Sequence, residues 1–262
     1  MLAETRSSRE RPLLECVNVT SRQADDFLIL DVVSLEVLPG DIVCLLGAAG
    51  AGKTAVLHTF LGFLRPTSGL ATVNGLVPAK DPIGARRCIT YIPRGASMYG
   101  VLTARRNLEF FVRVDGGGQG LKRNDYYEAM RRAGLPERAF ERPVRELGRT
   151  FQLLLWIAVG LLKNTPVLLI DEPTAGLDLH ASLRLQDMLV ELRRRGKAIL
   201  IATSDVLFAG RIATRIVVMK EGRRAGELTQ AELVARPLQD LYLEYTGQPS
   251  PPLVEQPSLA GR

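Results

Sequence analysis

One stretch of the chain combines glycine, lysine and threonine at a spacing that suits a bound phosphate group. It reads Gly47-Ala48-Ala49-Gly50-Ala51-Gly52-Lys53-Thr54, a full match to the pattern G-x-x-x-x-G-K-[ST]. Glycines let backbone N–H groups crowd around a phosphate, and the start of a following helix adds positive potential. Lys53 would place a cation on the β- and γ-phosphates, and the Thr54 hydroxyl would ligate Mg²⁺. The alternative, a glycine-rich turn with an exposed lysine, is the weaker interpretation.

Two carboxylates follow a second apolar run. Residues 167–172 read Val-Leu-Leu-Ile-Asp-Glu, so Asp171 and Glu172 come directly after an expected strand. Ligands of parallel α/β sheets bind at the carboxyl ends of the strands. Asp171 would hold Mg²⁺, directly or through water, and Glu172 would orient or deprotonate an attacking water. Alone, such a pair is better explained as a solvated strand end, but the phosphate loop favours the functional interpretation.

These side chains can act together only if strands and helices deliver them to one edge of a sheet. Short apolar runs precede both motifs, as expected for strands buried on both faces. The patterns predict strands at 13–20, 27–37, 42–46, 71–74, 88–92, 167–170, 198–203 and 215–219. They predict helices at 53–64, 103–114, 125–133, 147–162 and 179–195, the first ended by Pro66 and Gly69. This alternation predicts an α/β fold with a mainly parallel sheet.

The same patterns suggest how the chain is divided. A polar leader occupies 1–12, and a proline-rich tail without apolar periodicity, expected to be disordered, occupies 247–262. Residues 13–94 and 166–246 alternate strands with helices and would form the core. Residues 95–165 hold mostly helical signals and would form an inserted helical subdomain.

Composition excludes several classes of protein. Among 262 residues, 46% are hydrophobic and 24% are charged, so global disorder and collagen-like repeats are excluded. A net charge of +6 suits a phosphate ligand or an anionic membrane face, and is too diffuse to indicate nucleic acid. Three cysteines without metal-ligand spacing predict no disulfide framework and a reducing compartment. The longest apolar run, 151–162, is too short to span a bilayer, so a buried helix is expected.

At this point the chain resembles the ATP-binding subunit of ABC transporters, over roughly residues 13–246. Residues 171–178, Asp-Glu-Pro-Thr-Ala-Gly-Leu-Asp, resemble that family's Walker B segment running into its D-loop. Smaller pieces agree with the same family. They are residues 30–35 in the second strand, the turns at 66–69 and 74–75, and the pairs 102–103 and 107–108.

The resemblance implies a P-loop NTPase (RecA-like) core with a mainly parallel sheet, a small antiparallel β subdomain and a helical insertion. It also implies ATP and Mg²⁺ as ligands and a second ATP-binding subunit, as a homodimer or a heterodimer. A separate transmembrane permease subunit would be the other partner. The expected location is peripheral, on the cytoplasmic side of the cell (inner) membrane, with the permease docking on residues 94–111. No nucleic acid is expected.

The chain departs from the family at three sensitive positions. Arg94 stands where the family has a glutamine, Ser204 stands where it has the switch histidine, and Leu147-Gly148-Arg149-Thr150-Phe151 replaces the signature Leu-Ser-Gly-Gly-Gln. An arginine cannot accept a hydrogen bond or ligate a cation. Phe27 is the candidate for the aromatic residue that stacks on adenine.

Three functions remain open on the sequence alone. The first is an ATP-hydrolysing subunit that powers an export-type transporter, with Glu172 as its catalytic carboxylate. The second is a degenerate regulatory subunit with little or no hydrolysis, which pairs with another ATPase. The third is a soluble nucleic-acid-associated ATPase, supported only by the basic charge.

Overall fold

A six-stranded sheet forms the centre of the molecule. The computed structural model describes residues 11–23, 26–95, 97–114 and 117–247. The order of the strands is β5-β6-β7-β3-β8-β9, and all neighbours pair in parallel except β8 and β9. Their bounds are β3 Ile42–Leu46, β5 Ile89–Ile92, β6 Val167–Asp171, β7 Ala198–Thr203, β8 Arg215–Lys220 and β9 Arg223–Thr229.

The central strands are buried on both faces, which explains their unbroken apolar sequences. Successive side chains of a strand point to opposite faces. Along β3, Val43 and Leu45 enter one hydrophobic cluster, whereas Ile42, Cys44 and Leu46 enter the other. The sheet is therefore packed between two hydrophobic cores, which fix the positions of the carboxyl ends of its strands.

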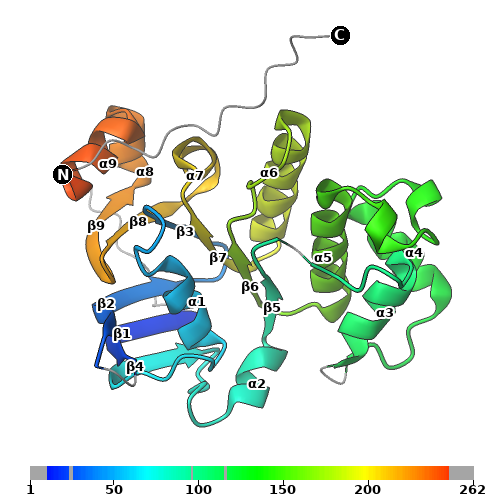
Figure 1. The fold of residues 1–262 in the computed structure, drawn as a ribbon, viewed down its shortest axis with the longest axis horizontal. Coiled ribbons are helices and arrows are strands. Elements are labelled where there is room, and N and C mark those ends of the chain that lie inside the picture. The colour runs from blue at the N-terminus through cyan, green and yellow to red at the C-terminus, as the bar shows by residue number, and fades with distance from the viewer. Residues whose placement is uncertain (1–10, 24–25, 96, 115–116, 248–262) are drawn as a thin grey trace.

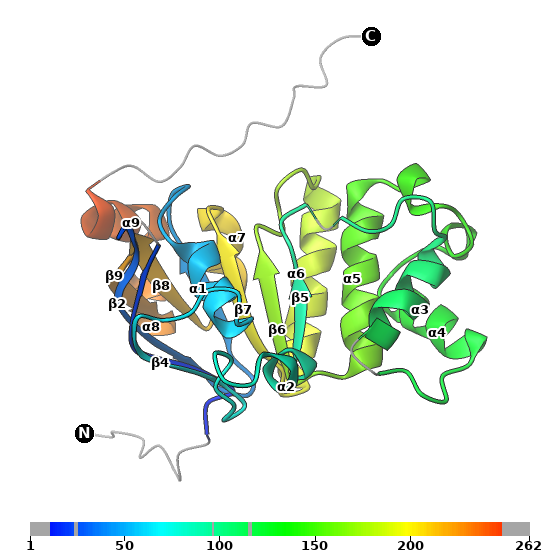
Figure 2. The ribbon, with the colours of Figure 1, turned by 60° about the horizontal axis from the view of Figure 1, so that its bottom comes forward.

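A small antiparallel sheet and one helix cover the first face. Strands β1 (Leu14–Arg22), β2 (Leu28–Val37) and β4 (Ser68–Val73) pair in the order β2-β1-β4. Helix α1 (Lys53–Phe60) lies between this sheet and the parallel sheet, as Figure 2 shows. Its buried Val56, Leu57 and Phe60 pack in the same cluster as residues from both sheets.

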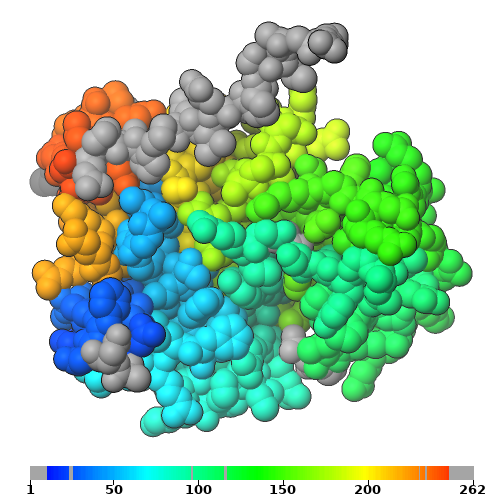
Figure 3. All heavy atoms as spheres, viewed as in Figure 1, coloured from blue at the N-terminus to red at the C-terminus, as the bar shows by residue number. Residues whose placement is uncertain are grey.

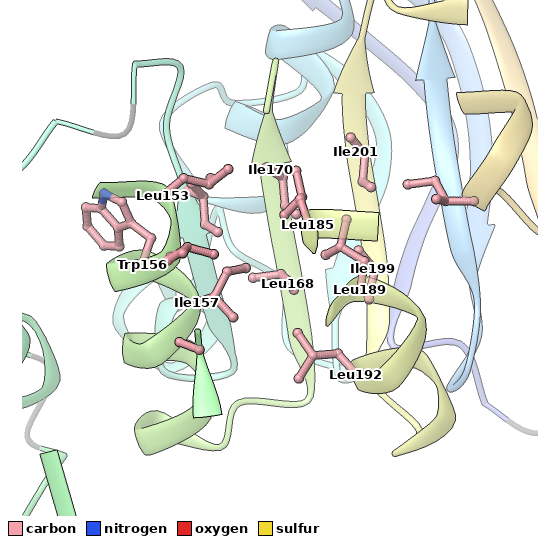
Figure 4. Packing of buried hydrophobic residues seen from close by; sticks show 14 of the residues in the cluster. Leu153, Trp156, Ile157, Leu168, Ile170, Leu185, Leu189, Leu192, Ile199 and Ile201 are labelled. Atoms are coloured by element: carbon pink, nitrogen blue, oxygen red, sulfur yellow. The ribbon is translucent and has the colours of Figure 1, made fainter. Parts of the chain in front are cut away.

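Helices cover the second face and extend to one side. They are α3 Ala104–Val114, α4 Arg123–Arg132, α5 Arg149–Lys163, α6 Leu179–Arg194, α7 Val206–Ile212, α8 Gln230–Ala235 and α9 Leu238–Thr246. Figure 4 shows Leu153 and Ile157 of α5 and Leu185 of α6 packed against Leu168 and Ile170 of β6. The helical part α3–α5 lies at one end of the molecule and the small sheet at the other (Figures 1 and 3).

The apolar run at 151–162 forms the buried side of α5, as predicted. Its Trp156 is only 8% exposed and packs on Phe111, with ring centroids 4.5 Å apart. Throughout the described part of the chain, no helix has both the length and the apolar character required to cross a membrane. The three cysteines are free, as expected.

Several predicted boundaries were wrong. The first helix ends at Phe60 rather than at residue 64, because Gly62 adopts a left-handed conformation (φ 73°) and closes a turn on Thr59. Gly69 belongs to β4 and does not end that helix. The sequence patterns also missed α2 (Pro82–Arg87), α7, β9, α8 and α9, which are short or mostly polar.

The predicted divisions of the chain remain predictions. The leader and the tail lie almost wholly outside the described residues.

One carboxylate ties together the helical part. Glu141 accepts hydrogen bonds from Arg105 Nε at 2.7 Å, Arg123 at 3.0 Å and the Tyr127 hydroxyl at 2.6 Å. These donors come from α3 and α4, so Glu141 links two helices to the segment before α5. Burial alone would raise the pKa of Glu141, but the three hydrogen bonds outweigh it and hold the pKa at about 2.

We predict that Glu141→Gln lowers the unfolding free energy by about 1 kcal/mol, because it weakens three charge-assisted bonds at an exposed site. In a chain of this size that corresponds to a melting temperature lower by about 2–4 °C. The pKa of Glu141 is depressed on folding, so its contribution is full above its ordinary value of 4.5 and is lost as pH falls towards about 2. Thermal melts between pH 2 and 8 measure both effects.

Glu146→Gln is the matched control. Both side chains are 41% exposed, but within the described residues Glu146 pairs only with Arg142, four residues before it in the chain. Equal losses of stability in the two variants would contradict the role given to Glu141.

Candidate functional site

The predicted phosphate loop connects β3 to α1. Gly52 is the N-cap of α1 and has φ 94°, a conformation that L side chains rarely adopt. The loop also passes close to Gly222: a Cβ built at position 52 would lie 3.0 Å from the Gly222 Cα. Gly47 is required for space, since a Cβ there would lie 2.5 Å from the Met219 carbonyl oxygen.

Lys53 lies inside the loop rather than on the surface. Its side chain is 5% exposed, and its Nζ donates to the carbonyl oxygens of Gly47 at 2.7 Å and Ala48 at 2.9 Å. Burial lowers the pKa of Lys53, and the nearby Glu172 carboxylate opposes that shift. The loop therefore wraps around its own lysine.

Thr54 and Asp171 meet although they lie 117 positions apart in the sequence. The Thr54 hydroxyl donates to Asp171 Oδ2 at 3.0 Å. The other oxygen, Oδ1, is buried and has no hydrogen-bond partner among the residues that the structure describes. Burial raises the pKa of Asp171, although the Thr54 hydrogen bond opposes this. An unpartnered carboxylate oxygen beside a hydroxyl is a donor set that suits Mg²⁺.

Glu172 is buried and is held from several sides. Its φ of 46° places it in the left-handed region, which costs about 1–3 kcal/mol at a non-glycine residue. Its N–H donates to Ala202 O at 2.8 Å, so the ladder between β6 and β7 continues through this residue. Oε2 accepts from the N–H and the hydroxyl of Ser204 at 3.0 and 3.2 Å. Oε1 lies 3.4 Å from Lys53 Nζ and 3.5 Å from an Arg94 nitrogen.

Two of the three positions that depart from the family therefore contact the same carboxylate. Sequence reasoning singled out Arg94 and Ser204 only as losses and did not foresee their contacts with Glu172. The strand register could have revealed the contact between Arg94 and Glu172. Ile92 pairs with Ile170, so Arg94 and Glu172 each lie two residues beyond a pair of neighbouring positions. The third position, Gly148, is the exposed N-cap of α5.

A small pocket opens beside the two carboxylates. It is lined by residues that follow β5, by the first turns of α5 and by the end of β6: Ile92, Pro93, Gly95, Arg149, Leu153, Asp171, Glu172 and Pro173. Phe27, the candidate adenine contact, is 65% exposed just before β2, and its role remains a prediction.

Known proteins resemble this chain in sequence and in fold. Residues 30–175 match the family described as ABC transporter. The chain belongs to the ABC transporter family. The Nod factor export ATP-binding protein I of Burkholderia thailandensis is 34% identical over 206 residues, which cover 79% of this chain and 67% of that protein. The taurine import ATP-binding protein TauB of Sinorhizobium fredii is 33% identical, over 77% of this chain and 74% of its own length.

One relative is far longer than this chain. The rat ATP-binding cassette sub-family A member 7 is 30% identical over 74% of this chain, which spans only 9% of the rat protein. Among solved structures, an ATP-binding subunit of an ABC transporter superimposes with a TM-score of 0.78 at 27% identity. That match covers 89% of this chain and 99% of the other. A cassette in a post-hydrolysis state with ADP and Pi gives a TM-score of 0.72 at 25% identity.

These matches confirm the resemblance and the predicted fold. The chain is an ATP-binding subunit of the ABC transporter type, with a P-loop NTPase core, a mostly parallel sheet and a small antiparallel sheet. Family membership makes it an ABC-type ATPase.

We predict that Asp171→Asn stabilises the nucleotide-free chain at neutral pH by about 1 kcal/mol, the usual scale when a functional-site cost is removed. The pKa of Asp171 is raised on folding, so its ionised form opposes folding. The gain should therefore fade as pH falls towards the ordinary value of 3.8. Thermal melts without nucleotide measure it. Asp187→Asn, on the exposed face of α6, is the control and should show no such gain.

Proposed function

We propose that the chain binds MgATP at its phosphate loop and hydrolyses it. The contact between Thr54 and Asp171 carries this proposal, because it unites the two motifs at one edge of the sheet. The N–H groups of residues 47–54 and the Lys53 ammonium would hold the phosphates. Thr54 and Asp171 would hold Mg²⁺, whose charge offsets that of the β- and γ-phosphates.

Glu172 is the proposed general base. Its Oε2 is fixed by Ser204, whereas the buried Oε1 faces Lys53 and Arg94 and has no hydrogen-bond partner among the described residues, so it can accept a hydrogen bond from water. Water oxygen would bond to the γ-phosphorus while the bond from that phosphorus to the β–γ bridging oxygen breaks. The bridging oxygen leaves with the electron pair as part of ADP, and Glu172 accepts the proton of the water.

Two substitutions separate binding from hydrolysis. Glu172→Gln should keep nucleotide affinity and lower kcat by at least about 10²-fold, because the base is lost. Lys53→Ala should weaken MgATP binding, because the main cation of the loop is lost. Steady-state hydrolysis and binding of a fluorescent ATP analogue measure the two effects. Unchanged turnover in Glu172→Gln would move catalysis to another subunit.

We further propose that the chain works as a dimer with a second ATP-binding subunit and powers export through a separate permease, on the inner face of the cell membrane. Support comes from the Nod factor export relatives and from a solved dimeric cassette at 25% identity. Import is the second candidate, supported by the taurine import relative. ATP-dependent transport into inside-out vesicles distinguishes the two directions.

A regulatory role with little hydrolysis is supported by Arg94, Gly148 and Ser204, since each departs from the family pattern. The Glu172→Gln experiment decides between this role and a working motor. Nucleic acid is not expected as a partner, and co-purification with a membrane protein rather than RNA or DNA tests that.

Residues 94–111 are the proposed docking surface for the permease. Within it, Tyr99, Val101 and Phe110 expose 49%, 74% and 40% of their area, an apolar patch that suits a protein partner. Val101→Asp and Arg106→Glu should each lower co-purification with the permease without lowering the melting temperature, because both residues are exposed. Unchanged assembly and unchanged coupled hydrolysis in both variants would contradict this surface.

A further inference from the structure

Burying the Glu172 carboxylate is electrostatically unfavourable, and the phosphate loop alone does not compensate for it. Its side chain is 5% exposed, and burying a carboxylate is costly unless cations or hydrogen-bond donors face it. The cations that face it in the described structure are Lys53 and Arg94, at 3.4 and 3.5 Å from Oε1. Ser204 provides two hydrogen bonds to Oε2 but no charge.

Binding of a triphosphate removes part of this compensation. The lysine of a phosphate loop pairs with the β- and γ-phosphates, so Lys53 would be shared with, or taken over by, the ligand. Glu172 would then face an anionic ligand, with Asp171, a second carboxylate, next to it in the chain. Of the two cations that lie within 4.0 Å of the Glu172 carboxylate in the described part of the molecule, Arg94 is then the one left to pair with it.

The backbone brings Arg94 to this place reliably. It follows β5, which pairs in parallel with β6, so the two strands end side by side (Figure 1). The Arg94 side chain is 64% exposed and borders the pocket lined by Pro93 and Gly95. It belongs to neither hydrophobic core, so its replacement should leave the packing of both intact.

We propose that Arg94 is a positioning residue for hydrolysis: its guanidinium pairs with the Glu172 carboxylate and keeps it aimed while the phosphates occupy Lys53. This rests on the proposed function of Glu172. An arginine suits this position because it stays protonated and its planar donors match a carboxylate. The opposite interpretation is that Arg94 restrains Glu172 and weakens it as a base. Phosphoryl transfer depends mainly on placing charge, which favours the positioning role.

The two interpretations predict opposite signs when Arg94 is replaced. Arg94→Ala, which removes the cation without installing the family's glutamine, should lower kcat by about 10²-fold, the scale for losing one preorganised contact. KM and the affinity for MgADP should stay within about threefold, because the phosphate loop is intact. Arg94→Lys should recover turnover to within about tenfold of the wild type, because charge returns without the planar fork. Equal or faster turnover in Arg94→Ala would overturn the proposal.

A second measurement does not depend on turnover. Vanadate together with MgADP imitates the transferring phosphoryl group. The affinity for vanadate therefore measures how well the charges around Glu172 are arranged for the transition state. Arg94→Ala should weaken vanadate binding by at least about tenfold while MgADP binding is unchanged. Arg138→Ala, at an exposed arginine on η1 (Glu137–Ala139), is the control and should change neither.

The outcomes separate this proposal from the one on which it rests. If wild-type turnover does not depend on Glu172, the proposed function fails, and vanadate binding still decides the role of Arg94. If turnover depends on Glu172 but Arg94→Ala binds vanadate like the wild type, the proposal for Arg94 alone is overturned.

Discussion

The structure is organised around charged side chains that are buried at one edge of the sheet. Lys53, Asp171 and Glu172 are all nearly inaccessible to solvent; Lys53 faces the Glu172 carboxylate, and Asp171 accepts a hydrogen bond from Thr54. Opposite charges at such distances interact strongly where water is excluded, but only if their positions are fixed. The rest of the fold can be understood as what fixes them.

The two hydrophobic cores provide that rigidity. Because β3, β6 and β7 are buried on both faces, the loops that follow them start from well-defined points. The left-handed conformation of Glu172 is maintained in the same way: the continued β6–β7 ladder offsets its cost and directs the carboxylate at Lys53 and Ser204. An exposed loop would relax to a less strained conformation and lose this aim.

The helical part is held differently, through polar contacts as well as apolar packing. Glu141 joins α3 and α4, while α5 packs its apolar side on the core of the sheet. After β5 the chain passes from the sheet towards the helical part, and Arg94, two residues beyond that strand, contacts Glu172.

The sequence by itself determined the phosphate loop, the acidic pair, the parallel sheet and the family, because each depends on local patterns along a few adjacent residues. It overlooked β9 and the short helices α2, α7, α8 and α9, whose polar or brief sequences carry weak periodicity. It also treated Arg94 and Ser204 only as missing functions. Only the tertiary structure decided that both contact Glu172. Strand register and chain crossover bring residues 94, 172 and 204 together, and no pattern within a single segment encodes that distance.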